Sequence, residues 1–584
     1  MKKSWVIRKQ NPKLREKISN QLNISPITAQ VLINRGIESE PEAESFLEST
    51  LFDLPSPFLM KGMDRAVERL TDAIERGEKV AIYGDYDVDG VTSTAILYSF
   101  LQKVGVDVVY YNPERLAEGY GIKSGAVEKL ARLGVTLIVS GDCGITAAAE
   151  IEEAGGLNVD FIVTDHHKPP ETLPDAVSVL NPIQRGCNYP GKEIAGVGVI
   201  FNLVVALRRA LRDSGFFNGR EEPNLGDYLD LVALGTVADC APLTNVNRIF
   251  VREGILRMTR PVRPGIEALK EVSGIGEEVS SVDIGFRLGP RVNASGRLAS
   301  ARAAVELLTT TNPEQARGIA EALDAENRKR QAIEADIISQ AVSIIESDEE
   351  IKRMPGIVLA SSDWHSGVIG IAASRVVEAY HKPAVLIAVG EDGVGRGSGR
   401  SVKGVDLYGA LSECRDLFTD FGGHELAAGL SIKEENIQRF RERFGEVLTA
   451  AKIDYAPRID IDCEVGLESV DEGLVEELGR LAPFGIGNPE PVFVAGPLSV
   501  ASLRVLKEKH VRFTVSSGGR TLNAIWFNAG SGVGLGEVGA ERGGRGVSVV
   551  FTPEFNVWNG RRELRLRVLD VDIPALPDAP EAAA

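Results

Sequence analysis

The stretch Lys79-Val80-Ala81-Ile82-Tyr83-Gly84-Asp85-Tyr86-Asp87-Val88-Asp89-Gly90 decides the fold. Its first five residues form an apolar run, a turn with three carboxylates follows, and a helical pattern continues from Val91 to Val104. An apolar run that ends in a turn and leads into a helix indicates a parallel β-strand followed by a crossover helix. The sequence therefore predicts a parallel α/β sheet with acidic side chains at the end of one strand.

The same arrangement recurs further along the chain. Ser140-Gly141-Asp142-Cys143-Gly144 follows the apolar run Thr136 to Val139, and Thr164-Asp165-His166-His167 follows the run Asp160 to Val163. A fourth stretch adds the carboxylate of Asp239 at the end of the run from Leu229, and this run fits either a strand or a helix by pattern. Its Ala and Leu content favours a helix with Asp239 at its carboxyl end.

Ligands of open parallel sheets bind at the carboxyl ends of the strands. Carboxylates from several strands are therefore expected to converge on one crevice, together with an imidazole. Such an oxygen-rich set suits Mn²⁺ or Mg²⁺, whereas structural zinc favours thiolates. Carboxylates shared between two ions give the paired-metal arrangement that is used for displacement at phosphorus.

The acidic and histidine motifs also occur in structures without such a metal site. An EF-hand loop starting at Asp85 needs a Glu at its twelfth position, and Ile96 stands there instead. A solvated acidic turn remains an alternative for this segment taken alone, because Asp and Gly are common in turns. The pair His166 and His167 could form a core pair or a surface turn, although the chain has six histidines in all, which makes a chance tandem at a strand end uncommon.

Neighbouring residues have expected supporting roles. Asp165 can hydrogen-bond a histidine ring N–H and fix its tautomer. Gly141 and Gly144 allow close approach of backbone and ligand around Asp142. We interpret Cys143 as a small packing residue.

Composition limits the class of protein. The five cysteines are scattered without a C-x-x-C motif, which indicates a reducing compartment. The first residues lack the apolar stretch of a signal peptide, and no apolar run approaches the length of a membrane span. We expect a cytoplasmic protein that is not inserted in a membrane, with a monomer as the default.

The charge is distributed unevenly. The net charge is −18, but residues 501–570 hold eleven Lys and Arg against six Asp and Glu, or +5, so the remainder carries −23. A basic module on an acidic body suits a localised nucleic-acid track better than indiscriminate coating of nucleic acid.

The 584 residues suggest three or four domains. We expect a helical lead-in over residues 1–57, a parallel α/β domain over 58–312, a long exposed helix over 313–350, a second parallel-sheet α/β domain over 351–455, an all-β barrel of short strands over 456–572, and a disordered tail over 573–584.

The motifs taken together resemble a known superfamily. The order G-D-Y-D-x-D-G, S-x-D-x-G, D-H-H and G-x-x-A-D is similar to the DHH phosphoesterases. The segments Pro290–Arg297, Trp364–Ile371, Gly397–Ser401 and Gly422–His424 resemble those of the RecJ branch and its DHH-associated domain. The resemblance runs from about residue 60 to the end of the chain, and it implies an oligonucleotide-binding (OB) fold for the barrel.

The resemblance implies a 5′-to-3′ exonuclease that releases mononucleotides from single-stranded DNA in repair and recombination. It implies that two Mn²⁺ or Mg²⁺ ions are held by Asp87, Asp89, Asp142, His166 and Asp239, with Asp85 adjacent. His167 would contact the scissile phosphate or donate a proton, assisted by Asp142 and Asp165, which we also count as catalytic. A groove between the two α/β domains would admit one strand and exclude a duplex. Expected partners are single-stranded DNA, single-strand-binding protein, helicases and mismatch-repair factors.

A further set of residues is expected to hold the strand. The segment Val394–Ser401 looks like a flexible, basic loop whose N–H groups form an anion-binding nest, although an ordinary hairpin turn explains it without the resemblance. Arg115 could equally form a surface ion pair, and single histidines are often structural. Phosphate or nucleic-acid contacts are implied for Arg115, Arg291, Asn293, Arg297, His365, Ser398, Arg400 and His424.

Aromatic and basic side chains alternate in the barrel. Such interleaving suits sequence-tolerant binding of a single strand, where each base stacks on a ring. Most of these rings are expected in the core, and one or two to contact bases. The candidates are Phe513, Trp526, Phe527 and Trp558, beside Arg504, Lys507, Lys509, Arg512, Arg561 and Arg562.

Three rival functions fit the sequence less well. A phosphodiesterase for short oligonucleotides or cyclic dinucleotides shares the DHH core but has no need of a basic barrel. A pyrophosphatase is disfavoured by the length of the chain and by the absence of a leading histidine in the first motif. A non-catalytic replication scaffold predicts eroded ligands, whereas every ligand position is occupied here.

Overall fold

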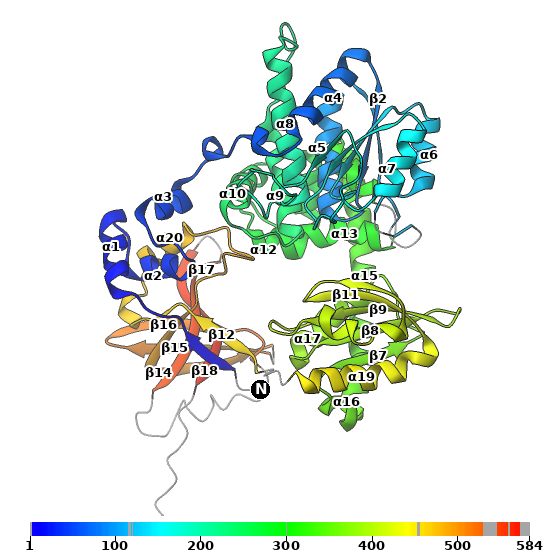
Figure 1. The fold of residues 1–584 in the computed structure, drawn as a ribbon. Coiled ribbons are helices and arrows are strands. Elements are labelled where there is room, and N and C mark those ends of the chain that lie inside the picture. Colours follow the sequence, from blue (N-terminus) through cyan, green and yellow to red (C-terminus); the bar gives the residue numbers. More distant parts are fainter. Residues whose placement is uncertain are drawn as a thin grey trace, which may run out of the picture. The chain divides into compact units, whose positions relative to one another are not determined.

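The structure is a computed structural model that describes residues 3–114, 118–119, 121–298, 301–451, 456–507, 509–529, 546–558 and 561–572, with the backbone alone for residues 295–298, 557 and 558. The tail that we expected to be disordered lies outside these residues. The chain forms two compact units (Figure 1). One runs from Asp53 to Tyr455, and the other combines Met1–Phe52 with the segment that begins at Ala456.

The unit Asp53–Tyr455 begins with a parallel sheet of five strands. They lie in the order β3-β2-β4-β5-β6, with β2 (Lys79–Gly84), β3 (Asp107–Tyr111), β4 (Leu137–Gly141), β5 (Asp160–Thr164) and β6 (Ser178–Leu180). The strands expected from apolar runs are therefore confirmed. The chain runs from β2 to β3 on one side, and from β3 it crosses to β4 on the other side of β2. The direction of winding therefore reverses between β2 and β4, which is where such sheets bind ligands.

Helices cover both faces of this sheet (Figure 1). Buried side chains of α6 and α7 pack on one face, while α5 and α8 pack on the other. Helix α9 ends at Ala238 with Asp239 as its C-cap, which confirms the helical interpretation of that run.

The helices of the chain between α3 and α15 are η1 (Leu51–Asp53), η2 (Pro57–Leu59), α4 (Met63–Arg76), α5 (Val88–Lys103), α6 (Ser124–Arg132), α7 (Ala148–Gly156), α8 (Gly196–Asp213), η3 (Leu225–Tyr228), α9 (Leu229–Ala238), α10 (Asn245–Thr259), α11 (Pro264–Ser273), α12 (Ser281–Asp283), the π-helical turn η4 (Ile284–Leu288), α13 (Gly289–Leu298) and α14 (Arg302–Thr309).

The long helix predicted from Pro313 is present as α15 (Pro313–Ser347). It leads into a second sheet in the order β10-β11-β9-β8-β7, formed by β7 (Ile357–Ser361), β8 (Ala384–Val389), β9 (Val394–Arg400), β10 (Phe418–Gly423) and β11 (Ala427–Lys433). The helices of this part are α16 (Glu349–Arg353), α17 (Ile369–Tyr380), α18 (Leu407–Ser412), η5 (Arg415–Leu417), η6 (Glu434–Asn436) and α19 (Ile437–Ala450).

The second α/β domain is present as expected, but its sheet is mixed and not parallel throughout. Only the pair β7–β8 is parallel, and β8–β9, β9–β11 and β10–β11 are antiparallel. The crossover helix α17 joins β7 to β8, whereas short connections join β8 to β9 and β10 to β11, as is usual for antiparallel neighbours.

The expectation of a flexible loop at Val394–Ser401 was also wrong, because most of this segment is β9, paired on both sides. The alternate glycines face a packed core. A Cβ at Gly397 would lie 2.6 Å from Leu430 Cδ1, and one at Gly395 would lie 2.6 Å from Ile387 Cγ2. The glycines thus make room for close packing, and the backbone N–H groups belong to the sheet instead of forming an anion nest.

The second unit contains a closed barrel. Strands β14 (Phe493–Leu506), β15 (His510–Ser517), β16 (Arg520–Trp526), β18 (Arg561–Asp572) and β17 (Val547–Trp558) pair in that order, and β17 pairs back with β14. The strands are longer than expected, reaching 14 residues in β14. Around them lie β12 (Arg458–Ile461), β13 (Cys463–Glu464), η7 (Leu467–Ser469) and α20 (Glu472–Gly479).

The amino-terminal segment belongs to this barrel unit. It contains a strand that we did not expect, β1 (Ser4–Ile7), which pairs in parallel with β12. The helices α1 (Pro12–Leu22), α2 (Pro26–Asn34) and α3 (Glu40–Glu48) share one hydrophobic core with the barrel, in which Ile18 and Leu32 lie with Phe513 and Phe551, all fully buried. The chain therefore builds this unit from its two distant segments.

Among the described residues, every helix is too short or too polar to cross a bilayer.

Candidate metal centre

The predicted ligands meet at the carboxyl edge of the first sheet. Asp85 follows β2, Asp87 caps the amino terminus of α5 by accepting from Gly90 N, and Asp89 lies in the first turn of that helix. Asp142 follows β4, Asp165, His166 and His167 follow β5, and Asp239 ends α9. Five separate elements thus deliver these side chains to one place.

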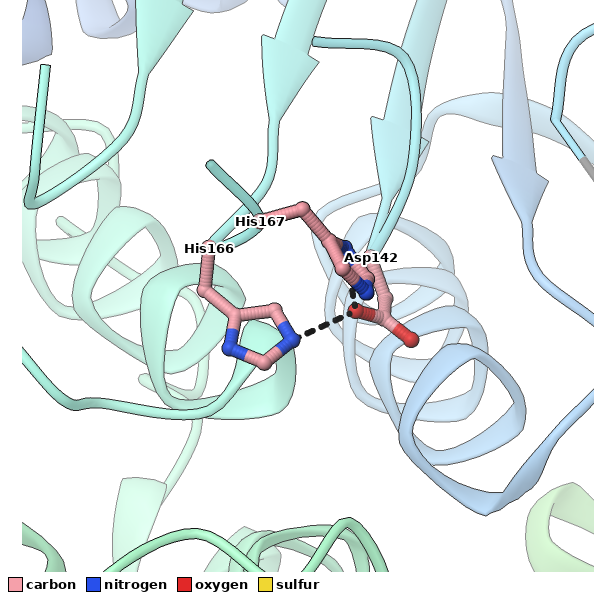
Figure 2. A group of neighbouring side chains, drawn as sticks. All are labelled: Asp142, His166 and His167. Carbon is pink, nitrogen blue, oxygen red and sulfur yellow. Dashed lines mark ion pairs between the residues drawn. The ribbon is translucent and has the colours of Figure 1, made fainter. Parts of the chain in front are cut away.

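Three adjoining groups of side chains are arranged to hold metal ions. They are Asp85, Asp87 and Asp142; Asp89, His166 and Asp239; and Asp142, His166 and His167, with the ligand atoms of each group within 4.8 Å of one another. Asp142 and His166 each belong to two groups. Figure 2 shows both histidine rings directed towards Asp142, with His166 Nε2 at 3.1 Å and His167 Nδ1 at 3.8 Å from Asp142 Oδ1.

The atoms at the centre of this cluster fit a cation. Asp142 Oδ1 and His166 Nε2 are buried and have no hydrogen-bond partner in the described part of the chain. His166 Nε2 also lies 3.7 Å from Asp239 Oδ2 and 3.9 Å from Asp89 Oδ2. Buried polar atoms that face one another without hydrogen bonds are costly unless something binds between them, and carboxylate and imidazole donors suit a divalent ion.

The electrostatics agree with this interpretation. Burial raises the pKa values of Asp89 and Asp142 well above the ordinary range, and the neighbouring carboxylates raise them further. Burial, with the charge of Asp87, raises the pKa of Asp239 to about 7. Burial lowers the pKa of His166 to about 4, which keeps the imidazole neutral, as a metal ligand requires. The ionised forms of these carboxylates therefore repel one another in the metal-free protein, and a bound cation would relieve that repulsion.

Asp165 orients the segment that carries both histidines. Its carboxylate accepts hydrogen bonds from the backbone N–H groups of Ile145, His166 and His167, and it lies 2.8 Å from His167 Nδ1. The expected hydrogen bond between Asp165 and a histidine ring is thus present. Burial alone would lower the pKa of His167, but the hydrogen bond and charge of Asp165 raise it to about 9. The ring of His167 is therefore protonated at neutral pH, unlike that of His166.

Asp142 occupies a restricted position. Its φ is +63°, in the left-handed region that is uncommon for residues other than glycine, although Asp tolerates it better than most. Gly196 lies against it, since a Cβ at Gly196 would come within 2.8 Å of both Asp142 Cβ and Oδ1. The carboxylate is thus held in place by its own backbone and by the start of α8.

The sequence motifs did not reveal the role of α8. Both oxygens of Asp89 accept from the first turn of this helix, from Gly196 N and Val197 N at 2.7 Å each. Because backbone N–H groups make these bonds, no side-chain type marks them in the sequence. The available signal was the glycine-rich helix start Ala195-Gly196-Val197-Gly198.

The residues expected to hold the strand are more dispersed. Arg115 and the side chain of Arg297 lie outside the described part of the chain. Arg291 is ion-paired with Asp324 of α15 at 2.9 Å and also donates to the carbonyl of Arg287, so its guanidinium ties α13 to its neighbours. Asn293 accepts from Val88 N, which makes it a support of the Asp87–Asp89 turn.

The remaining candidates belong to the second sheet. Ser398 and Arg400 lie on the face of β9 that meets α17, where a Cβ at Gly370 would come 2.9 Å from Ser398 Oγ and 3.1 Å from Arg400 Nη2. His365 accepts from Gly367 N in the turn before α17. His424 is exposed in the connection between β10 and β11.

The barrel offers a basic concavity on its own surface. A hollow of about 390 Å³ is lined by Arg512, Arg561 and Arg565 together with Asn523 and Asn556. Of the four expected aromatic residues, Phe513 is fully buried, Trp526 packs against the core, Phe527 is 41% exposed, and the side chain of Trp558 is not described. Phe527 is thus the best placed of the described three to contact a base.

Three known protein families match separate segments of the chain. Residues 79–236 match the amino-terminal domain of the DHH family, residues 353–450 match the DHHA1 domain, and residues 461–570 match the RecJ OB domain.

Individual relatives extend over nearly the whole chain. A single-stranded-DNA-specific exonuclease RecJ from Bacillus subtilis is 36% identical over 579 residues, covering 98% of this chain and 71% of that protein. The crystal structure of Thermus thermophilus RecJ with Mn²⁺ has a TM-score of 0.82 and 30% identity, covering 98% of this chain and 80% of that one. The structure of the same protein with Mg²⁺ has a TM-score of 0.75 and 28% identity, covering 98% and 79%. On this similarity and on its three matched domains, the chain belongs to the RecJ family.

Proposed function

We propose that this protein is a metal-dependent exonuclease that degrades single-stranded DNA from its 5′ end to 5′-mononucleotides. The proposal rests on the three adjoining groups of candidate metal ligands, which are connected because Asp142 and His166 each belong to two of them. Shared ligands suit two ions close together, which is the arrangement used to displace an oxygen at phosphorus. The relatives named as single-stranded-DNA-specific exonucleases support the choice of substrate.

Two Mn²⁺ or Mg²⁺ ions are the proposed cofactors, and the Thermus relative has been solved with Mn²⁺ and with Mg²⁺. One would be held by Asp87 and Asp142 with Asp85 adjacent, and the other by Asp89, His166 and Asp239. When bound, the ions supply Lewis-acid activation of the phosphate and of the attacking water.

The surrounding residues have distinct proposed roles. His167, whose protonated ring is held by Asp165, stabilises charge on the scissile phosphate or gives a proton to the departing 3′ oxygen. Ser398 and Arg400 are proposed to hold a phosphate of the strand beside the start of α17, with Arg115 and Arg297 as further contacts. The basic hollow of the barrel is proposed to bind the strand further from its end.

The cellular setting is proposed from the same family membership. We place the protein in DNA repair and recombination in the cytoplasm, as a monomer that acts with single-strand-binding protein, a helicase or mismatch-repair factors. The scattered cysteines, none in a C-x-x-C motif, agree with a reducing compartment.

The test is a long single strand with different labels at its two ends, incubated with Mn²⁺ beside a matched duplex. We expect rapid release of the 5′ label as mononucleotide, an intact duplex, and an inactive Asp142→Ala variant. Survival of the long strand with cleavage of dinucleotides or cyclic dinucleotides would instead identify a phosphodiesterase for short substrates. Release of the 3′ label first would contradict the proposed polarity.

A further inference from the structure

A cavity between α13, α15 and α17 carries an exposed aromatic side chain. The cavity has a volume of about 440 Å³, and Phe286 lines it from the π-helical turn η4. Phe286 is 73% exposed, whereas the neighbouring apolar residues of that turn, Ile284 and Leu288, are fully buried. Because the ring of Phe286 is exposed to solvent, it does not contribute to the hydrophobic core. The π-helical turn that carries it is a kind of turn that is frequent at functional sites.

The position of the cavity relates it to both parts of the proposed site. On one wall Asn293 lines the cavity and accepts from Val88 N, between Asp87 and Asp89 of the metal centre. On another wall lies Ile371, next to Gly370, which packs on Ser398 and Arg400. The cavity therefore adjoins the metal centre on one side and the proposed phosphate-holding side chains on the other.

The lining favours an uncharged ring over a phosphate. Glu334 pairs with Arg330 and with Arg375, and Arg375 also pairs with Glu378 outside the lining, so both arginines of the walls already have a carboxylate partner. Pro290, Ile338 and Ile371 contribute apolar surface beside Phe286. The amides of Asn293 and Gln331 provide polar groups at the edge, as in sites that hold flat heterocycles.

We infer that this cavity receives one nucleobase of the substrate strand and that Phe286 stacks on it. The inference rests on the proposed function and adds a residue that positions the strand through a base instead of through a phosphate. A base can turn into such a cavity only when it is unpaired, so the contact also favours single strands over duplexes.

The test uses strands of about twelve nucleotides that carry 2-aminopurine at one of the first positions from the 5′ end, bound in EDTA so that metal-dependent cleavage does not occur. Stacking on an aromatic ring quenches this base. We expect quenching at one position with the wild type and with Phe286→Trp, and its loss in Phe286→Ala. The matched control is Val282→Ala, which truncates another exposed apolar side chain four residues earlier and leaves the quenching unchanged.

Affinity and turnover provide the second readout. Phe286→Ala should weaken binding of a normal strand about tenfold, and should weaken binding very little when the quenched position is an abasic site. The base contact would be overturned if Phe286→Ala weakened binding of the normal and the abasic strand equally, or if it quenched 2-aminopurine as strongly as the wild type. If the wild type still degrades single strands in that case, the proposed function stands. A wild-type protein that neither binds nor degrades single strands would overturn the proposed function and this inference together.

Discussion

At the scale of single residues, Asp142 combines three unfavourable conditions. It is buried, it adopts a left-handed backbone conformation, and its oxygen faces His166 without a hydrogen bond. Strain of this kind persists where the surrounding structure imposes it, and it commonly marks a functional site. A bound cation would offset the free-energy cost of burying this carboxylate. Metal binding is therefore expected to raise the stability of the folded protein through Asp142.

Replacing Asp142 by Asn should therefore have opposite effects on activity and on metal-free stability. We expect turnover to fall by more than about 100-fold, because a ligand shared by two groups is lost. In EDTA at pH 7.5 the free energy of unfolding should rise by about 1–3 kcal/mol, because a neutral amide replaces a carboxyl whose ionisation is opposed by burial and by its like-charged neighbours. Urea denaturation with EDTA and with Mn²⁺ measures the effect on stability, and release of mononucleotides measures turnover.

The control for this substitution is Asp213→Asn, which removes a carboxylate that is 68% exposed at the end of α8. It should change neither the stability in EDTA nor the increase in stability on adding Mn²⁺. An Asp142→Asn protein that is still stabilised by Mn²⁺ as strongly as the wild type would rule out Asp142 as a ligand.

The raised pKa of Asp239 predicts how the metal-free protein responds to pH. The folded pKa is about 7 and the ordinary value is 3.8, so between these values the folded state binds more protons than the unfolded state. Stability therefore falls as pH rises from about 4 to 7. Thermal unfolding in EDTA across this range should show a falling midpoint, with a shallower fall in Asp239→Asn. A midpoint that rises over the same range would contradict the assignment.

At the scale of elements, the first turn of α8 is the part of the site that motifs did not show. Its N–H groups fix Asp89, and Gly196 leaves room for Asp142. A side chain at this position must displace the carboxylate, because Asp142 Cβ as well as Oδ1 would lie within 2.8 Å of the added carbon. The turn therefore sets the spacing between carboxylates of two ligand groups.

Gly196→Ala should lower the affinity for Mn²⁺ by about tenfold or more, as expected when a support of a metal ligand is disturbed. Calorimetric titration of the metal-free protein with Mn²⁺ measures this without relying on turnover. Gly198→Ala is the matched control, since its Cβ would meet Ile194 Cγ1 at 2.4 Å, away from the carboxylates. It should lower stability but keep the affinity. Equal losses of affinity in both variants would show that general damage to the helix is responsible.

The elements that the sequence predicted well are those with local signals. Strands β2, β4 and β5 are apolar runs that end in turns, and α15 is a long stretch with few helix breakers, so each can be recognised from neighbouring residues alone. Strand β9 was mistaken for a loop because Gly395, Gly397 and Gly399 pack against a core that only the folded sheet reveals. The convergence of the candidate metal ligands could be predicted because their motifs sit at strand ends, whereas the ion pair of Arg291 could not, because its partner, Asp324, lies 33 residues away.

At the scale of the whole molecule, the barrel unit depends on both of its segments. Strand β1 pairs with β12 across more than 400 residues of sequence, and Leu32 of α2 lies in the same core as the barrel residues. A pairing over such a distance leaves no local pattern, which is why the first 57 residues looked like a separate helical lead-in. The segment is a structural part of the unit that contains the basic hollow of the barrel.

Truncating Leu32 to Ala should destabilise the barrel unit by about 2–5 kcal/mol, because the side chain is fully buried. Tryptophan fluorescence follows this unit well, since Trp5, Trp526 and Trp558 belong to it and Trp364 does not. The urea midpoint seen by fluorescence should fall, while Mn²⁺ affinity of the metal centre stays the same. Leu256→Ala, at a side chain that is 61% exposed, is the control. An unchanged midpoint in Leu32→Ala would contradict the shared core.

The shared core also has a consequence for protein synthesis. The first 52 residues leave the ribosome well before their partners, because about 400 residues of the other unit lie between them. At 5–20 residues per second, that delay is roughly 20 to 80 s. During this time the apolar faces of α1–α3 have no barrel to cover them, while the metal-binding unit already has its whole sequence available to fold. The metal-binding unit is therefore expected to be complete before the barrel, and the nascent amino-terminal helices are expected to need protection by a chaperone until the barrel forms.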